Sequence, residues 1–347
     1  MSDPRFYLDH AATTPLLPEA AAAMAQGFAI WANPSSPHRA GRAARAALED
    51  ARARIGAALG WSGEVILTSG ASEALALAID RAHAALVAVS DVEHEAVLRH
   101  AGNTARLGVD QAGLVLPGDD APFHGLVAIQ HVNNETGVIQ PIDALSAKVR
   151  EAGGVLLADC AQSAGKLALP DADMIAISAH KFGGPVGIGA LLVRDWALVR
   201  PSGGQERGYR GGTENLPGAL AMAAALEAGN DWLARAGVLR ARLDAAIIAG
   251  GGAVIAAGAP RIAVIGACRI PGVSANAQLI RLDAQGIAVS AGSACSSGSL
   301  RTSHVLTAMG VAGAGEVIRV SIGRETTAAD IDRFIAAWQA IAAGARA

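Results

Sequence analysis

Lysine and cysteine are both scarce in this chain. Lysine occurs only at Lys148, Lys166 and Lys181, although the chain has 28 lysine and arginine residues in total. There are three cysteines and no C-x-x-C pair, which argues against a disulfide framework and against a zinc site, so no metal centre is expected. The formal net charge of −3 gives no basic field for nucleic acid.

Long apolar runs are missing as well. The stretch most similar to one, residues 245–260, is interrupted by glycines and flanked by charged residues, so it does not predict a transmembrane helix. The first residues lack the basic and apolar regions of a signal peptide. With the unpaired cysteines, these features predict a cytoplasmic protein that does not bind membranes.

Short apolar runs are plentiful, and they alternate with helical patterns through the first two-thirds of the chain. This order predicts an α/β fold with a mostly parallel sheet flanked by helices. From about residue 226 the pattern changes to a helical stretch, a strand-rich stretch and a closing helix. We therefore expect a large α/β domain over residues 15–228 and a smaller α+β domain made of residues 1–14 and 229–347.

Polar side chains recur where the predicted strands end, which is where ligands gather in such sheets. Lys181 and Asp159 are two of them, 22 positions apart, at the ends of neighbouring predicted strands. A pyridoxal 5'-phosphate (PLP) site needs this pair, because an amine binds the aldehyde covalently and a carboxylate keeps the ring nitrogen protonated. The two residues alone are equally compatible with a surface salt bridge or with no relationship.

Further positions favour the cofactor site. The segment "TSGASEA" follows a predicted strand and opens a helix, so the amides of Ala71 and Ser72 can receive a phosphate. Ser178 and His180, beside Lys181, are candidate phosphate donors. His94 is placed at a strand end, where it could lie over an aromatic ring, although a histidine there is more often a structural hydrogen-bonding group.

A set of motifs spread from about residue 7 to residue 327 resembles one known family. The chain resembles the cysteine desulfurases of the NifS-like group, which are class V members of the PLP-dependent transferases with the aspartate aminotransferase-like fold and its seven-stranded type of sheet. The matching segments are "YLDHAATTP", "NPSSPHRAGR", "TSGASEA", "VEHEAV", "VNNETGVIQPI", "DCAQSAGK", "SAHKFGGPVGIGALLVR", "GGQERGYRGGTEN", "GIAVSAGSACSSGS" and "IRVSIGRETT".

The resemblance implies a role for each matching residue. Lys181 would bind PLP covalently, Asp159 would pair with the pyridine nitrogen and His94 would stack on the ring. Gln162 would contact the phenolic oxygen, with Asn134 nearby. The phosphate would be bound by Ala71, Ser72, Ser178 and His180, and by Thr213 of the other subunit of a homodimer. Asn33 and Arg319 would bind the substrate carboxylate. Arginine suits a carboxylate because its planar fork pairs with both oxygens.

Cys295 stands apart from the other two cysteines. Cys160 and Cys268 lie in apolar surroundings, as a small buried side chain would. Cys295 lies in the glycine- and serine-rich run "SAGSACSSGS", which favours an exposed nucleophile. The resemblance implies that L-cysteine is converted to L-alanine, that Cys295 carries the sulfur as a persulfide, and that an acceptor protein, such as an iron–sulfur scaffold or another sulfur carrier, takes it.

Two other functions remain open at this point. The same fold could serve a selenocysteine lyase or another class V PLP enzyme, since the sequence does not separate sulfur from selenium. A non-catalytic protein with the PLP fold would be expected to lack the lysine, the aspartate or the loop cysteine, and all three are present. Lys166, seven positions after Asp159, is the one rival for the covalent lysine.

Overall fold

The computed structural model describes residues 6–118, 120–292 and 302–344. A seven-stranded sheet forms the centre, with strand order β2-β8-β7-β6-β5-β3-β4. Its strands are β2 (Glu64–Thr68), β3 (Leu86–Ser90), β4 (Ala105–Leu107), β5 (Leu126–Gln130), β6 (Val155–Asp159), β7 (Met174–Ser178) and β8 (Gly189–Val193). Only β8 is antiparallel to its neighbours, so the predicted mostly parallel sheet is confirmed.

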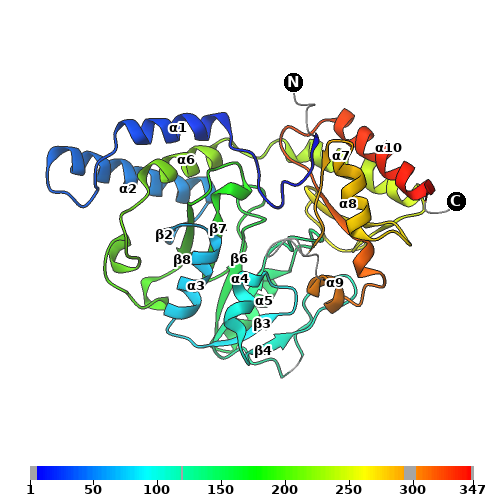
Figure 1. Cartoon of the computed structure of the whole chain (residues 1–347). Helices are drawn as coiled ribbons and strands as arrows, with labels where there is room; N and C mark the ends of the chain where they lie inside the picture. Colours follow the sequence, from blue (N-terminus) through cyan, green and yellow to red (C-terminus); the bar gives the residue numbers. More distant parts are fainter. Residues whose placement is uncertain (1–5, 119, 293–301, 345–347) are drawn as a thin grey trace.

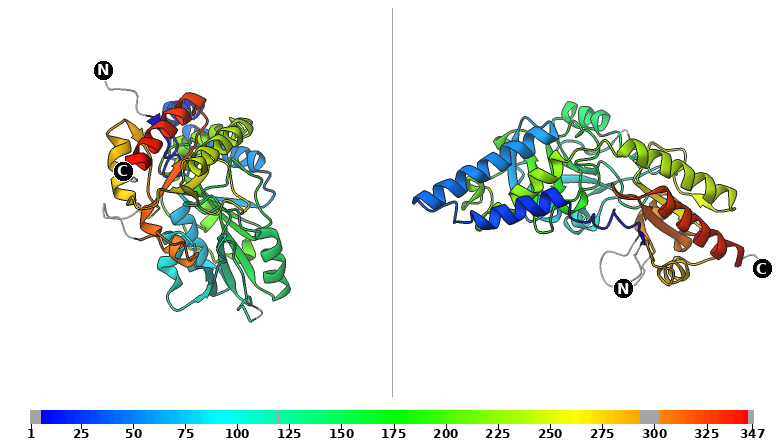
Figure 2. Two further views of the ribbon diagram at one scale, coloured as in Figure 1. Left: turned by 90° about the vertical axis from the view of Figure 1, so that its right-hand side faces the viewer. Right: turned by 90° about the horizontal axis from the view of Figure 1, so that it is seen from above.

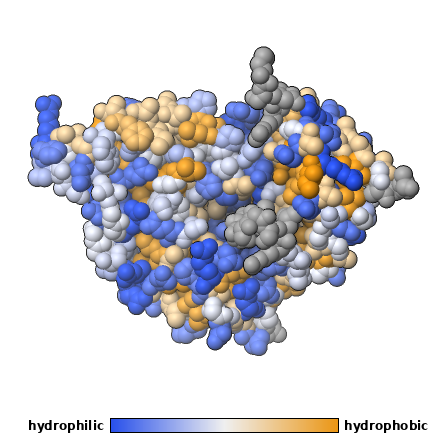
Figure 3. Space-filling view, viewed as in Figure 1, coloured by the Kyte–Doolittle hydropathy of each residue, from blue (hydrophilic) through white to orange (hydrophobic). Residues whose placement is uncertain are grey.

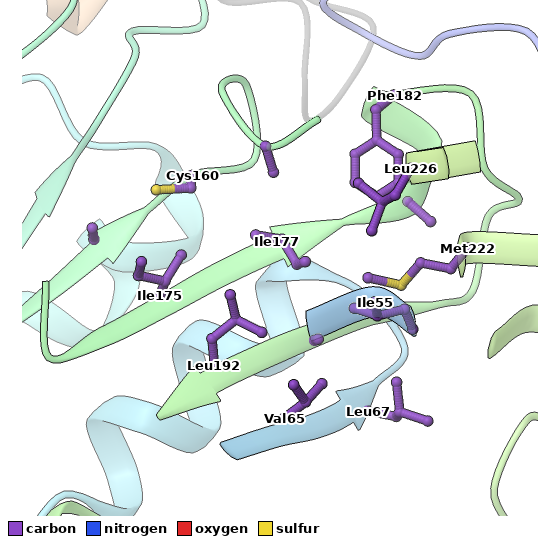
Figure 4. Close-up of a cluster of buried hydrophobic side chains, with 14 of the residues drawn as sticks. Ile55, Val65, Leu67, Cys160, Ile175, Ile177, Phe182, Leu192, Met222 and Leu226 are labelled. Atoms are coloured by element: carbon purple, nitrogen blue, oxygen red, sulfur yellow. The ribbon is translucent and has the colours of Figure 1, made fainter. Parts of the chain in front are cut away.

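The sheet is covered by helices on both faces, and alternate residues of each strand face opposite ways. Val65 and Leu67 of β2 pack into one core with residues of α2 and α6, whereas Ile66 between them packs into another core with α3. Figure 4 shows part of the first of these cores, where side chains of β2, β7 and β8 meet those of α2 and α6. Burial on both faces explains why the strands are uniformly apolar.

The helices that flank this sheet are α1 (Pro18–Ala29), α2 (Arg39–Leu59), α3 (Ala71–Arg81), α4 (Glu95–Ala101), α5 (Ile142–Glu151) and α6 (Leu216–Glu227). Helices α1, α2 and α6 pack together at one end of the molecule (Figure 1). Three short 3-10 turns, η1 (Ala179–Lys181), η2 (Trp196–Leu198) and η3 (Glu206–Gly208), lie in the connections.

A second body lies at the other end of the elongated molecule (Figure 2). Its strands are β9 (Ala253–Val254), β10 (Ile265–Arg269) and β12 (Val317–Ser321) in an antiparallel sheet, and β1 (Phe6–Tyr7) paired in parallel with β11 (Ile287–Ala288). Its helices are α7 (Leu233–Ala249), α8 (Ala275–Asp283), α9 (His304–Ala308) and α10 (Ala328–Gly344), with the 3-10 turn η4 (Ala314–Glu316).

A separate hydrophobic core supports this second body. It joins Leu8 near the start of the chain with Leu239 of α7 and with Phe334 and Trp338 of α10, all buried. The N-terminal segment thus packs with residues from the last third of the chain. The division into two domains at residues 14/15 and 228/229 remains a prediction. In the described part of the chain, no helix combines the length and the apolar character needed to cross a bilayer.

Candidate active site

A cavity of about 480 Å³ lies at the edge of the large sheet where β2, β3, β5, β6 and β7 end. Parallel strands bring their carboxyl ends to one edge, which is why polar residues far apart in the sequence meet there. The predicted residues that line this cavity are Ala71, Ser72, His94, Asn134, Asp159, Gln162, Ser178, His180, Lys181 and Arg319.

Lys181 ends the short turn η1 that follows β7. Its Nζ donates hydrogen bonds to the carbonyl oxygens of Ala11 at 2.7 Å and Ala12 at 2.8 Å. Those carbonyls belong to the N-terminal segment, which is tied to the same turn by the amide of Thr14 bonding to the carbonyl of His180. The lysine amine is therefore held at the boundary of the two bodies, facing the cavity.

Asp159 is the last residue of β6 and only 8% of its surface is exposed. Burial raises the pKa of its carboxyl group, while the hydrogen bond from the Ala161 amide and the nearby His94 and Lys181 act in the opposite direction. A buried carboxylate of this kind is stabilised by a cationic partner in the cavity.

His94 lies four residues beyond the end of β3, so it is not the strand-end residue that the sequence predicted. It is the N-cap of α4, and its Nδ1 accepts a hydrogen bond from the Ala96 amide at 3.1 Å. Burial lowers the pKa of the imidazole. This shift favours the neutral ring at neutral pH. Because Nδ1 accepts the capping bond, the proton of the neutral ring is on Nε2, and the bond fixes the ring in the cavity wall.

The start of α3 forms the polar end of the cavity. Its N-cap, Gly70, has no side chain to bond the first-turn amides, so those of Ala71 and Ser72 are available to a ligand. The φ angle of Gly70 is +153°, a region that favours glycine. A Cβ placed there would lie 3.3 Å from the hydroxyl of Ser178, so glycine also keeps this corner open.

His180 faces the same cavity as the phosphate-site candidates. Its Nδ1 is 3.1 Å from the hydroxyl of Thr13. Burial lowers the pKa of His180 to about 4, and the positive charges of Lys181 and Lys166 act in the same direction. At neutral pH the ring is neutral and offers one N–H donor.

Two buried polar atoms at the cavity lack a hydrogen-bond partner among the described residues: Oε1 of Gln162 and Nε of Arg319. The rest of each side chain is fixed. Gln162 donates from Nε2 to the Ala11 carbonyl at 2.9 Å, and Arg319 donates to the Asn134 carbonyl and to Asp9. Because unsatisfied buried polar atoms are costly, these two atoms mark a place where a bound molecule would complete the network.

Two of the predicted residues that the structure describes, Asn33 and Thr213, do not line this cavity. Asn33 and Thr213 are exposed, in the connection between α1 and α2 and in the segment before α6, and Asn33 uses its side-chain oxygen to accept from the Ser35 amide. Cys295 lies outside the described residues. Cys160 and Cys268 are buried, as expected for cysteines with a packing role, and burial raises the pKa of the Cys160 thiol well above its usual range.

Lys166, the rival lysine, does not line the large cavity. It is 7% exposed, its Nζ donates to the Gln162 carbonyl at 3.0 Å, and it lines a neighbouring cavity of about 30 Å³ rather than the large one. Burial lowers the pKa of its amine to about 7, with Lys181 contributing. This geometry favours Lys181 as the lysine that meets a ligand in the larger cavity.

Sequence reasoning missed two acidic residues near the site. Asp9 pairs with Arg319, and Glu135 is buried beside Asn134. Both lie in segments quoted for their motifs ("YLDHAATTP" and "VNNETGVIQPI"), so the available signal was the motif itself. Glu93, which the sequence places with His94 after a predicted strand, is buried as well. Their burial and their partners depend on tertiary contacts.

Comparison with known proteins decides the family. The model of the family described as aminotransferase class-V matches residues 6–334. The chain belongs to the aminotransferase class-V family. A cysteine desulfurase of Cereibacter sphaeroides is 37% identical to it, with 95% of this chain and 94% of the relative covered.

Solved structures of similar proteins agree with this assignment. A NifS-like protein from Rickettsia africae superposes with a TM-score of 0.87 at 28% identity, covering 97% of this chain and 99% of the other. A structure described as SspA in complex with cysteine has a TM-score of 0.77 at 28% identity, covering 92% and 99%. The predicted family and the predicted α/β fold are thereby confirmed.

Proposed function

We propose that the chain is a PLP-dependent cysteine desulfurase, which removes sulfur from L-cysteine, releases L-alanine and carries the sulfur as a persulfide on Cys295. The observation that carries this proposal is the single cavity in which Lys181, Asp159, the start of α3 and Arg319 converge. The similarity of the chain to curated cysteine desulfurases, over nearly its whole length, supports the same reaction.

The residues of the cavity fit PLP. The uncapped start of α3, with Ser178 and His180 nearby, suits the phosphate, because helix N-termini offer free amides and a favourable dipole. Asp159 suits a protonated ring nitrogen. The buried Gln162 oxygen without a partner suits a polar substituent of the ring, and Lys181 supplies the amine for the covalent link.

Bound PLP would supply an electron sink for the bonds at the substrate Cα. The chain supplies the positioning and the proton transfers. Arg319 would orient the substrate carboxylate, Asp159 would hold the cofactor ring in its charged form, and Lys181 would remove the Cα proton. The neutral ring of His94 would pack over the cofactor from its place as the cap of α4.

Cys295 would accept the sulfur. Its thiolate attacks the substrate sulfur, so that an S–S bond forms while the Cβ–S bond breaks. The electron pair of the broken bond remains with the three-carbon fragment, which takes up protons and leaves as alanine. The persulfide sulfur then passes to an acceptor, for which an iron–sulfur scaffold or a sulfur carrier protein is the proposed class.

A homodimer would complete the site. Thr213 is exposed and lies away from the cavity of its own chain, as a residue that serves a partner's phosphate site would. Apolar side chains gather along α1 in Figure 3, and Phe28 and Trp31 near its end are 63% and 47% exposed. An apolar surface of this kind next to α6 favours burial against a second copy.

The experiment that tests this function is reduction of the purified, PLP-loaded protein with borohydride, followed by peptide mapping. A cofactor adduct on Lys181 and release of alanine in step with persulfide from L-cysteine are the expected results. Attachment to Lys166, or an absence of alanine, would overturn the proposal. Turnover of L-selenocysteine, measured in parallel, tests the alternative of a selenocysteine lyase.

A further inference from the structure

Glu135 is a buried acid that the proposed reaction does not use. It is 3% exposed and lies in the turn after β5, next to Asn134. The side chain of Asn133 fixes this turn, because its Oδ1 accepts from the amides of Glu135 at 2.9 Å and Thr136 at 2.8 Å. The carboxyl group is thus placed by a rigid backbone rather than by a mobile loop.

The carboxyl group of Glu135 contacts residues on both sides of segment 293–301. After the segment, the hydroxyl of Ser303 donates to Oε2 of Glu135 at 2.6 Å. Before the segment, Gly292 lies so close that a Cβ built on it would be 1.9 Å from the same oxygen. One carboxylate oxygen therefore meets both flanks of the segment that contains Cys295.

Each flank is itself fixed to the body of the protein. Ser303 is the N-cap of α9, and its Oγ also accepts from the Leu306 amide at 3.1 Å. On the other side, Ser290 exchanges backbone hydrogen bonds with Arg319 of β12. Arg319 in turn donates to the carbonyl of Asn134, the neighbour of Glu135.

We propose that Glu135 is a positioning residue that holds together the two ends of the segment that contains Cys295, at a fixed place relative to Arg319. This inference rests on the proposed function, since it concerns delivery of the Cys295 thiol to substrate held by Arg319. A side chain that keeps residues 292 and 303 near each other lowers the entropic cost of bringing the two ends of the segment together.

The chemistry of the contact explains the choice of residues. A carboxylate oxygen can accept the Ser303 hydroxyl and lie against a backbone that has no side chain, and glycine at 292 provides that backbone. Burial raises the pKa of Glu135, and the hydrogen bond from Ser303 opposes this shift. A glutamine at this position would keep an acceptor oxygen of nearly the same shape, whereas an alanine would remove both the bond to Ser303 and the side chain that lies against Gly292.

The test compares Glu135→Ala, Glu135→Gln and Ser303→Ala in the PLP-loaded protein. We expect kcat for persulfide formation on Cys295 to fall by about 10- to 100-fold in Glu135→Ala, because small misplacements of reacting groups have effects of this size. KM for L-cysteine should stay within about threefold, since substrate binding is not removed. Glu135→Gln should restore most of the lost rate.

Two further measurements separate a positioning role from damage to the cofactor site. The change in cofactor absorbance on adding L-cysteine should be as in the unmodified chain, and hydrogen exchange of residues 302–309 should accelerate in Glu135→Ala. Glu316→Ala is the matched control, because that acid pairs with Arg269 elsewhere in the same body and touches neither flank. It should keep the kcat of the unmodified chain.

The outcomes separate this inference from the proposed function. If the unmodified chain produces no alanine, the proposed function fails. If it is active and both Glu135→Ala and Ser303→Ala keep full kcat, or lose the absorbance change together with activity, the positioning role is wrong. Should Glu135→Ala fail to fold, the result with Ser303→Ala decides.

Discussion

The guanidinium group of Arg319 donates to the carboxylate of Asp9 at 2.9 Å, joining positions 310 residues apart. The same guanidinium donates to the Asn134 carbonyl, also at 2.9 Å, and is 2% exposed. Two bonds to different segments fix the plane of the fork. Asp9 therefore helps to orient the guanidinium group of Arg319 for binding a carboxylate.

Arg319→Lys should raise KM for L-cysteine by at least about tenfold with a smaller effect on kcat. A lysine has one ammonium group and cannot bond Asp9, Asn134 and a substrate carboxylate with the geometry of a planar fork. Steady-state kinetics of alanine release measure this. Arg269→Lys, on the neighbouring strand β10 and paired with Glu316, is the control that should leave KM unchanged.

Cys295→Ser should abolish persulfide formation and leave the cofactor absorbance intact. The hydroxyl that replaces the thiol is a much poorer nucleophile toward sulfur and cannot form a persulfide. Mass spectrometry of the protein after incubation with L-cysteine measures the persulfide. A serine variant that makes alanine at the normal rate would show that Cys295 is not the acceptor.

Gly70→Ala should weaken PLP binding by roughly 10- to 100-fold, which corresponds to the 1–3 kcal/mol cost of a strained backbone conformation. The strain arises because φ at this position is +153° and the added methyl group would lie 3.3 Å from the Ser178 hydroxyl. Titration of the cofactor-free protein with PLP measures the affinity. In Gly237→Ala, on an open part of α7, the affinity should not change.

Glu93→Gln should make the protein progressively more stable than the unmodified chain as the pH rises from about 4.5 to about 8. Burial raises the pKa of Glu93 from 4.5 to about 8, so its folded form keeps a proton that the unfolded form loses. The stability that this group contributes is complete below pH 4.5 and is lost as the pH approaches 8.

The contacts of Glu93 make glutamine a suitable replacement. Both hydrogen bonds to the side chain, from Ser90 and from the Gln130 amide, go to one oxygen, which a glutamine retains. The difference in unfolding free energy should grow by at most about 1.4 kcal/mol per pH unit. Urea unfolding at several pH values measures it. A constant difference across this range would contradict the assignment.

Glu206→Ala should destabilise the protein by about 3–5 kcal/mol, the cost of leaving a buried charge without its partner. Glu206 is 2% exposed and accepts from both terminal nitrogens of Arg52, at 2.6 and 3.1 Å, as well as from the Leu67 amide. Denaturant unfolding measures the loss. Glu227→Ala, which breaks a more exposed pair with Arg54, should cost less than about 1 kcal/mol.

Much of the site could be predicted because strand ends are local signals. The apolar runs that end at Asp159 and Ser178 identified two strands, and their parallel order brought the following residues to one edge. His94 was misplaced because the strand before it ends at Ser90, and three more residues lead into the cap of α4. A cap and a strand end look alike in a single sequence, since both follow an apolar run.

Contacts between distant segments were beyond sequence reasoning. Nothing local in "VNNETG" indicates that Glu135 meets Ser303, 168 positions later. The strands β1 and β11 have two residues each, too few to show a periodic pattern. Their pairing exists because the surrounding core holds them in place.

The pairing of β1 with β11 also has a consequence for synthesis on the ribosome. Phe6 leaves the ribosome early, whereas its partner Ile287 is translated 281 residues later. At 5–20 residues per second this delay is roughly 15 to 60 s. During that interval the carbonyls of Ala11 and Ala12 lack the downstream strand that anchors their segment, so the pocket around Lys181 matures only when translation is nearly finished.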